Sequence, residues 1–332
     1  MIRLLALGAA VALAPMARAQ SVPPPPPPSL LDVMGHYGSG LTEVVVYEDG
    51  GLLAAHTEGR TLRLRRTGSR SYAVSGGPPW VGDRLDFLPD SGRATTIHLG
   101  RYTLGRRLVG PADGQVFRIA PLRPVAEVLR EARTARSPHG PGRQRPDLVD
   151  VQRLVPHVVL DVRYATPRNF MGVPLYPEAR VILQRPAAQA LARVQQDLAR
   201  YGLGLVLYDG YRPWYVTKAF WDATPPEQRG FVANPGDGSK HNRGCAVDLG
   251  LVALQTGEIV EMPSAYDEFT SRAYADYPGG TSRARHFRDL LRRTMETHGF
   301  AVNPTEWWHF DFRGWRDYGV LNTPFEGVPV GR

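Results

Sequence analysis

The first half of the chain carries a succession of short segments in which polar and apolar residues alternate, separated by glycine-containing turns. Residues 61–65 and 71–74 alternate in this way, and Asp49-Gly50-Gly51 separates two earlier segments. Alternation with a period of two places the apolar side chains on one face of a strand, whereas an amphipathic helix needs a period near 3.6. Residues 35–121 are therefore predicted to form a small all-β domain, either a sandwich or a barrel.

The N-terminal end has the pattern of an export signal. Arg3 is followed by the apolar run 4–13 and by Ala17-Arg18-Ala19, a small-residue cleavage pattern. The run is too short to span a bilayer, so residues 1–19 are predicted to be a cleaved signal peptide and not a transmembrane anchor; a buried N-terminal helix is the alternative. Residues 20–34, which are rich in proline, are predicted to form a stiff spacer. We expect an exported protein, periplasmic or secreted.

The second half of the chain mixes the two periods. Residues 122–147 include a breaker-rich stretch of proline and glycine and are predicted to be a linker. Residues 148–332 then carry helical and strand patterns in irregular order: predicted helices 186–201 and 282–298, and predicted strands 203–208, 246–254 and 258–262. Because these elements do not follow a regular βαβ repeat, the α+β class is favoured.

Cysteine usage and charge exclude several classes of protein. Cys245 is the only cysteine, so no intramolecular disulfide can form, and packing, with or without a metal, must hold the fold. The formal net charge is +8, but its arginines are spread along the whole chain without an aromatic-interleaved basic stretch, so no nucleic-acid partner is expected. His36, His56 and His98 lack the spacing of metal ligands and are interpreted as ordinary histidines.

One candidate functional segment spans residues 239–248, which read Ser-Lys-His-Asn-Arg-Gly-Cys-Ala-Val-Asp. His241 lies in a glycine-containing loop that leads into a predicted strand, and Asp248 stands on that strand between Val247 and Leu249. Burying an aspartate among apolar neighbours is unfavourable unless it is paired or binds a metal. The segment therefore predicts a metal ligand or, as the alternative, a buried salt bridge.

A second segment, residues 305–312, places Glu306 and His309 within an aromatic strand. Aromatic walls remove water from a carboxyl group, which raises its pKa toward the range useful for proton transfer. Residues three apart on a regular strand point to opposite faces, so Glu306 and His309 share a site only if Glu306 precedes the strand or a bulge re-aims it. The alternative is a core strand whose histidine is hydrogen-bonded internally.

Together the two segments offer two histidines, one aspartate and a spare glutamate. Three protein ligands, an open position for water and a carboxylate that does not bind the metal are the usual parts of a catalytic zinc site. The two imidazoles favour zinc, although manganese or iron would accept the mixed nitrogen and oxygen ligands.

A third segment, residues 208–213, places Arg212 on a turn after a predicted strand. Its permanent positive charge, if it faces the metal, would stabilise the oxyanion of a tetrahedral intermediate. The alternative is a surface arginine that pairs with Asp209.

These residues together resemble the D-alanyl-D-alanine dipeptidases of the VanX type. The shared pattern is Ser-x-His-x-x-Gly-x-Ala-x-Asp and Glu-x-Trp-His, with Asp-Gly-Tyr-Arg-Pro upstream, and the likeness covers roughly residues 148–325. It implies a mixed α+β peptidase domain over residues 148–332, to which the β-rich N-terminal domain is an addition.

The resemblance also implies roles for individual residues. The ligands of one catalytic zinc ion would be His241, Asp248 and His309. Glu306 would be the general base and Arg212 the stabiliser of the transition state. Ser239 and Asp267 would position the substrate, with Asp267 suited to a free ammonium group; an ion pair with Arg272 is the alternative for Asp267.

Two positions depart from the family pattern. Asn242 and Cys245 stand where small hydroxyl residues are expected. Cys245 is interpreted as a buried, unreactive thiol, with an adventitious contact to the metal as the alternative.

The expected activity is zinc-dependent hydrolysis of a small dipeptide of D-amino acids, D-Ala-D-Ala. The alternatives are a zinc D,D- or L,D-carboxypeptidase or endopeptidase acting on peptidoglycan peptides, or a cell-wall peptide-binding protein without catalysis.

Overall fold

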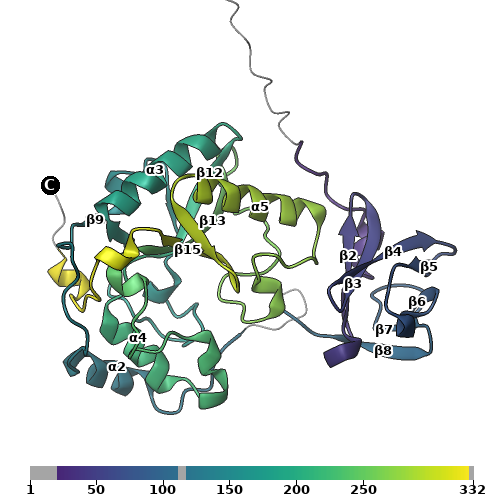
Figure 1. The fold of residues 1–332 in the computed structure, drawn as a ribbon, viewed down its shortest axis with the longest axis horizontal. Helices are drawn as coiled ribbons and strands as arrows, with labels where there is room; N and C mark the ends of the chain where they lie inside the picture. The colour runs from purple at the N-terminus through teal and green to yellow at the C-terminus, as the bar shows by residue number, and fades with distance from the viewer. Residues whose placement is uncertain (1–20, 111–116, 329–332) are drawn as a thin grey trace, which may run out of the picture.

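The computed structural model describes residues 21–110 and 117–328, which form two lobes (Figure 1). The predicted signal peptide, residues 1–19, lies outside these ranges. After the one-turn helix α1 (Pro28–Leu31), the smaller lobe is built from eight strands. They are β1 (Gly35–Tyr37), β2 (Val44–Asp49), β3 (Leu52–Thr57), β4 (Arg60–Arg66), β5 (Ser71–Ser75), β6 (Arg84–Leu88), β7 (Thr96–Leu99) and β8 (Tyr102–Arg107).

The eight strands form a closed antiparallel barrel. Each strand pairs with its neighbours in the chain, and β1 also pairs with β8, so that no edge of the sheet is left open. The alternating pattern explains the interior: on β4, Leu62 is fully buried between the exposed Thr61 and Arg63. Of the two predicted architectures, sandwich or barrel, the structure has the barrel.

The larger lobe contains a mixed sheet of five strands in the order β10-β12-β13-β15-β14. The pair β10 and β12 is parallel and the other pairs are antiparallel. The strands are β10 (Val159–Leu160), β12 (Leu203–Asp209), β13 (Ala246–Ala253), β14 (Phe300–Asn303) and β15 (Glu306–Phe312). A separate two-stranded sheet joins β9 (Leu148–Asp150) to β11 (Ile182–Gln184).

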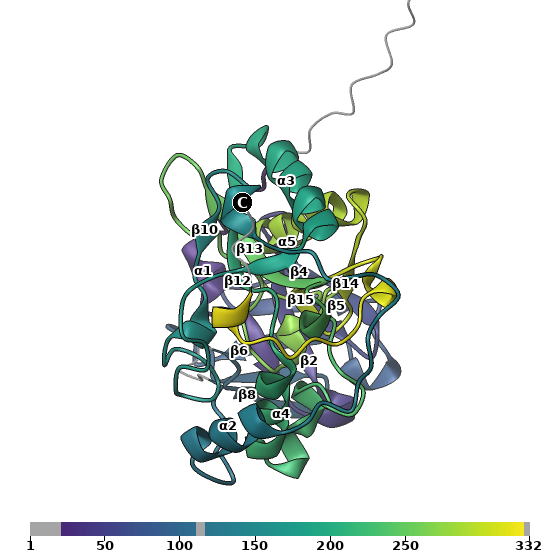
Figure 2. The ribbon, with the colours of Figure 1, turned by 90° about the vertical axis from the view of Figure 1, so that its left-hand side faces the viewer.

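The helices of the larger lobe lie on both sides of this sheet. Helices α3 (Arg185–Ala199) and α5 (Ser282–Thr297) lie on one side, and α2 (Val125–Thr134) and α4 (Trp214–Ala223) lie on the other (Figures 1 and 2). Both α3 and α5 are amphipathic, and their apolar stripes, such as Leu191 and Val194 of α3, belong to the large core. In the described part of the chain no helix is long and apolar enough to cross a membrane.

Two segments of this lobe differ from the elements that the sequence predicted. Helix α2 falls within residues 122–147, the predicted linker, but its Val128 and Ala132 are buried in the core of the larger lobe. The predicted strand 258–262 is reduced to one bridge between Ile259 and Val252, which is formed by hydrogen bonds from Ala253 N–H to Glu258 O and from Val260 N–H to Leu251 O.

Candidate active site

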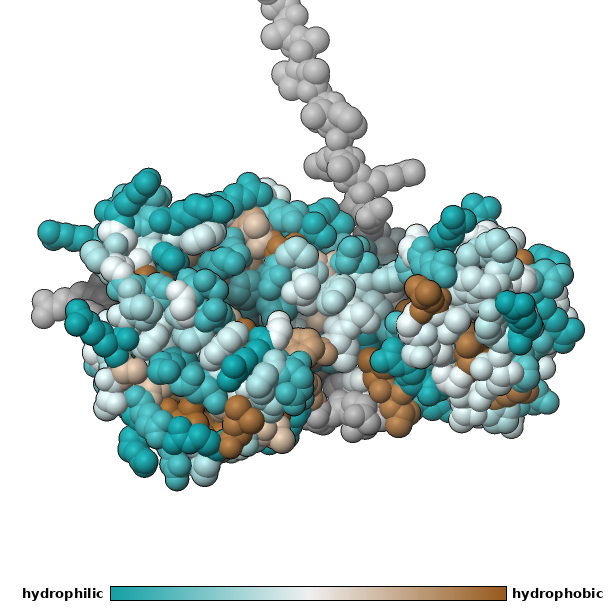
Figure 3. All heavy atoms as spheres, turned by 60° about the horizontal axis from the view of Figure 1, so that its bottom comes forward, coloured by the Kyte–Doolittle hydropathy of each residue, from teal (hydrophilic) through white to brown (hydrophobic). Residues whose placement is uncertain are grey.

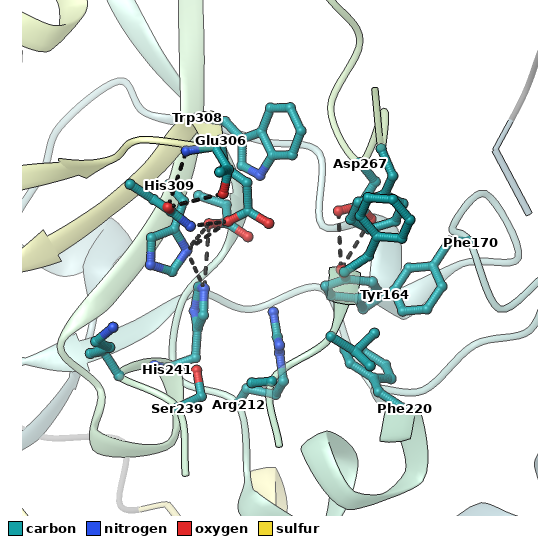
Figure 4. A pocket seen from close by; sticks show the side chains of 18 of the residues that line it. Tyr164, Phe170, Arg212, Phe220, Ser239, His241, Asp267, Glu306, Trp308 and His309 are labelled. Carbon is teal, nitrogen blue, oxygen red and sulfur yellow. Dashed lines mark hydrogen bonds and ion pairs between the residues drawn. The ribbon is translucent and has the colours of Figure 1, made fainter. Parts of the chain in front are cut away.

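The three predicted metal ligands come together at one edge of the central strands (Figure 4). Asp248 on β13 and His309 on β15 are direct cross-strand partners, so their side chains lie on the same face of the sheet. His241 reaches them from the turn that precedes β13, and the candidate ligand atoms of all three lie within 4.8 Å of one another.

Local backbone geometry explains how His241 reaches the sheet. A single 3₁₀ turn, η7 (His241–Arg243), carries it, and Gly244 ends that turn with a positive φ of 66°. A side chain at Gly244 would place its Cβ 2.6 Å from Leu148 Cδ2, so the position is restricted by packing as well as by backbone conformation. His241 Nδ1 lies 2.7 Å from the carbonyl oxygen of Gly210. A carbonyl only accepts, so Nδ1 donates to Gly210 and Nε2 is the nitrogen directed at the other ligands.

His309 is oriented in the complementary way. Its Nε2 lies 2.9 Å from Asp311 Oδ1, which leaves Nδ1 to face Asp248 and His241. Burial lowers the pKa of His309, but its contacts with Asp248 and Asp311 outweigh burial and raise the pKa to about 10.

The ligand group has the donors that a metal ion needs. Asp248 is almost fully buried, and its Oδ1 makes no hydrogen bond of acceptable geometry, although it lies 3.0 Å from His309 Nδ1 and 3.4 Å from His241 Nε2. Burial opposes ionisation of Asp248, but the two histidines hold its pKa below the ordinary range. A buried, ionised oxygen without a hydrogen bond beside two imidazole nitrogens fits a divalent cation with mixed ligands.

Glu306 lies beside the ligand group without belonging to it. The pairing of β14 with β15 shifts between Val302 and Asn303, so the regular alternation is broken between Glu306 and His309. Glu306 Oε2 consequently lies 3.7 Å from His309 Nδ1, and it accepts a hydrogen bond of 2.8 Å from Asn303 Nδ2. Burial and the charge of Asp248 raise the pKa of Glu306. The predicted irregularity in this strand is confirmed.

Arg212 lies in the same pocket, held by a carboxylate from the preceding strand. Asp209 Oδ2 accepts from Arg212 Nε at 3.1 Å and Nη2 at 2.7 Å, while Tyr176 donates to Asp209 Oδ1. The guanidinium also stacks over the rings of Tyr164 and Phe220 at 5.3 and 4.9 Å. The Asp209 pair was the expected alternative for a surface arginine, but Arg212 is only 8% exposed and the pair lies inside the site.

Asp267 lies across the pocket from the ligand group (Figure 4). Its backbone has a positive φ of 58°, and its carboxylate accepts hydrogen bonds of 3.0 and 3.3 Å from the hydroxyl of Tyr164. Burial raises the pKa of Asp267 well above its ordinary range, and Asp248 adds to the shift. Arg272, the alternative partner, pairs instead with Glu268 at 3.3 Å.

The remaining predicted residues are placed as follows. Ser239 lines the same pocket, and its Oγ accepts a hydrogen bond from the backbone N–H of His241. Asn242 is fully buried and donates to Arg212 O and Thr217 Oγ1, which holds η7 against the start of α4 and the turn before it. Burial raises the pKa of the Cys245 thiol to about 12, and Cys245 belongs neither to the ligand group nor to the pocket wall.

The pocket itself has a volume of about 260 Å³ and an aromatic wall. Aromatic side chains on this wall are Tyr164, Phe170, Phe220, Phe231, Phe269 and Trp308. Most of the other lining residues are polar or charged, so the aromatic rings surround a strongly polar centre, which suits a small charged ligand.

Sequence reasoning missed three residues that orient the site. Asp311 holds His309, Tyr266 donates to Asp248 Oδ2 at 3.1 Å, and Tyr164 donates to Asp267. A signal existed for Asp311, which stands two residues after His309 and therefore on the same strand face. No comparable signal marked Tyr164, whose partner is 103 positions away.

Comparison with known proteins agrees with this geometry. Residues 144–328 match the peptidase family M15, described as D-ala-D-ala dipeptidase. A D-alanyl-D-alanine dipeptidase of Escherichia coli (strain K12) is 35% identical over 179 residues, which cover 54% of this chain and 91% of that relative. Proteins of the same name from Enterococcus faecium and Enterococcus faecalis are 33% and 36% identical, over 90% and 83% of their lengths and 49% and 45% of this chain. The barrel precedes the matched region, and the chain belongs to the M15 family of peptidases.

Proposed function

We propose that the protein is an exported, zinc-dependent dipeptidase that hydrolyses D-alanyl-D-alanine. One observation carries this proposal: a single pocket has His241, Asp248 and His309 on one side and the buried Asp267 on the other. A cation site and an ammonium site facing each other match a short substrate with a free amine. The relatives are D-alanyl-D-alanine dipeptidases, which supports the same substrate, and the pattern of residues 1–19 supports export.

Zinc is the cation that these donors favour, because two imidazoles and one carboxylate are typical of catalytic zinc. When bound, zinc lowers the pKa of a water molecule and polarises the scissile carbonyl. The ring orientations of His241 and His309 are already fixed by Gly210 O and Asp311, so little reordering is needed on binding.

Glu306 moves the proton. Its raised pKa and its position 3.7 Å from His309 Nδ1 suit a carboxylate that accepts a proton from the attacking water and passes it to the leaving amine. Asn303 holds one carboxylate oxygen, so that the group stays directed at the pocket.

Arg212 stabilises the oxygen that becomes negatively charged as the carbonyl is attacked. Asp209 and the rings of Tyr164 and Phe220 fix the guanidinium before the substrate arrives, so no reorganisation is needed during the reaction.

Asp267 sets the length of the substrate. The ammonium of a dipeptide lies one residue from the scissile bond, and a buried carboxylate gains most from a partner of opposite charge. An N-acylated peptide lacks that charge and would leave Asp267 without a partner. Ser239 contributes a hydroxyl to the same pocket.

The test is a comparison of turnover on D-Ala-D-Ala, its N-acetyl form and a pentapeptide that ends in D-Ala-D-Ala. We expect efficient cleavage of the free dipeptide alone. Comparable rates on the free and N-acetylated dipeptides would refute the dipeptidase and favour a carboxypeptidase. No hydrolysis of any of the three by protein with full zinc content would favour a binding protein.

A further inference from the structure

The loop that carries Asp267 has almost no regular structure of its own. Residues 263–281 lead from the arm beside β13 to α5 and contain only one short turn, η8 (Ser271–Ala273). A long connection of this kind takes its conformation from the contacts that it makes with the rest of the molecule. Many of those contacts come from the barrel, which forms a separate lobe beside the peptidase (Figure 3).

The first contact joins the barrel to the start of α5, the end of the helix that faces the barrel in Figure 1. Glu48 of β2 is 2% exposed, and its Oε2 accepts a hydrogen bond of 2.6 Å from the backbone N–H of Ser282. The backbone N–H of Glu48 donates to Gly280 O, and Gly50 N–H donates to Ser282 Oγ. A carboxylate at this end of a helix satisfies a free N–H and interacts favourably with the helix dipole.

The second contact lies in the middle of the loop. His36 of β1 stacks on Tyr277, with ring centroids 5.7 Å apart and ring planes 3° from parallel. His36 Nε2 also lies 2.7 Å from the Tyr277 hydroxyl, and both side chains are buried. Glu43 of the barrel holds the other ring nitrogen of His36 at 3.0 Å.

The third contact surrounds Asp267 itself. Arg272 Nη1 donates to Val109 O, on the chain leaving the barrel, at 2.8 Å, and Nε and Nη2 donate to Pro263 O. Arg272 also pairs with Glu268, whose Oε2 accepts from Ala265 N–H at 3.1 Å. One arginine thus ties both sides of the Asp267 turn to the barrel exit.

We propose that the barrel is a positioning element that holds the Asp267 loop in the conformation that binds the substrate ammonium. This inference rests on the proposed function. If the loop is held only part of the time, the apparent affinity falls by that fraction. The hydrogen bonds and ion pairs of the Glu306 and Arg212 side chains in the described ranges stay within the peptidase lobe, so the chemical step should persist. Glu48, His36 and Arg272 are thereby assigned as positioning residues.

The experiment uses the full-length, zinc-loaded protein with Glu48→Ala and, as a matched control, Asp86→Asn. Asp86 is also a barrel carboxylate, but its partners, Ser71 and Arg84, are in the barrel. The measurements are kcat and KM for D-Ala-D-Ala, zinc content, and hydrogen–deuterium exchange of residues 263–282. We expect Glu48→Ala to raise KM about tenfold with kcat within about twofold, and to speed exchange in this loop. Glu48→Gln, which keeps an acceptor oxygen, should restore part of the affinity.

Faster exchange together with a higher KM, at full zinc content, supports the positioning role. Three results would overturn the positioning role. The first is an exchange rate in Glu48→Ala equal to that of the wild type, and the second is faster exchange with a wild-type KM. The third is an equal rise in exchange and KM in the control Asp86→Asn. If Glu48→Ala does not fold, Tyr277→Phe, which removes one hydroxyl, is measured in the same way and judged by the same outcomes. Failure of the wild-type protein to hydrolyse D-Ala-D-Ala would refute the proposed function; the exchange measurement would still report on the loop.

Discussion

The barrel and the peptidase lobe differ in where they bury charge. The barrel has an apolar interior, and its buried histidine and carboxylate, His36 and Glu48, lie where it contacts the peptidase lobe. The peptidase lobe buries Arg212 and Asp248 at one pocket, with Asp209 behind Arg212. Burying charge is unfavourable unless a partner compensates it. Buried charge in the barrel therefore marks the contact with the other lobe, and around the pocket it marks the proposed site for a metal and substrate.

The largest difference between the two lobes is expected when a proposed metal ligand is replaced. His309→Ala removes one of three ligands, so the protein should lose its zinc and all measurable turnover. His98→Ala, an exposed histidine of the barrel, should leave both unchanged. Metal analysis measures the zinc content and a hydrolysis assay measures turnover. Full zinc content in His309→Ala would contradict the ligand assignment.

A somewhat smaller effect is expected at the general base. Glu306→Gln keeps the shape of the side chain but removes the proton acceptor, so turnover should fall by about 10²–10⁴ while zinc content stays full. The matched variant in the barrel is Glu58→Gln, whose carboxylate accepts a hydrogen bond from Trp80 Nε1 and does not line the pocket. Loss of zinc from Glu306→Gln would make Glu306 a ligand.

Arg212→Ala should act mainly on the transition state. Removing a preorganised cation beside the reacting carbonyl should lower kcat by about 10²–10³, with a smaller change in KM. Arg84→Ala, which breaks an exposed ion pair with Asp86 in the barrel, should change neither constant. A change in KM alone for Arg212→Ala would mean that Arg212 only binds the substrate.

The pH dependence of kcat/KM tests the buried carboxyl groups of the pocket. Burial, the largest cause, raises the pKa of Asp267 and also that of Glu306, and both carboxyl groups must be ionised for activity. The kcat/KM for D-Ala-D-Ala should therefore fall as pH is lowered through these pKa values, by up to about a hundredfold per unit when both titrate. In Asp267→Asn the acid-side slope should drop to about tenfold per unit. An unchanged slope would show that Asp267 does not titrate in the reaction.

The smallest expected effect concerns the one cysteine. With a pKa of about 12, the Cys245 thiol should be protonated at pH 8 and resist alkylation in the folded protein. Thiol titration before and after denaturation measures this, with reaction expected only after unfolding. Rapid modification of the native protein would contradict a buried thiol.

Sequence patterns were most informative at charged residues whose burial is unfavourable without a partner. Asp248 between apolar strand neighbours indicated a metal or a salt bridge, and the three-residue spacing of Glu306 and His309 required an irregular strand, which the structure has. In the barrel, period-two alternation predicted the strands but could not distinguish a sandwich from closure, because closure depends on pairing between β1 and β8.

The contact between the lobes could not be predicted from local patterns. Glu48 looks like an ordinary polar residue near a hairpin turn, and its partner Ser282 is 234 positions away. One weak signal was present: Val44-Val45-Val46-Tyr47 is apolar on both faces, unlike the alternating strand β4, and all four residues are buried. The guanidinium of Arg285 lies over the Tyr47 ring at 5.0 Å, so the outer face of β2 is covered by the peptidase lobe.

The direct pairing of Asp248 with His309 has a consequence for folding in the compartment where the protein works. An ion held by these two residues and His241 links two adjacent strands and the turn before one of them. Such an ion binds the folded chain and not the unfolded one, so free metal at about a thousand times its dissociation constant would add about 4 kcal/mol to stability. Metal supply would then control how long the protein survives against proteolysis, as well as how fast it works.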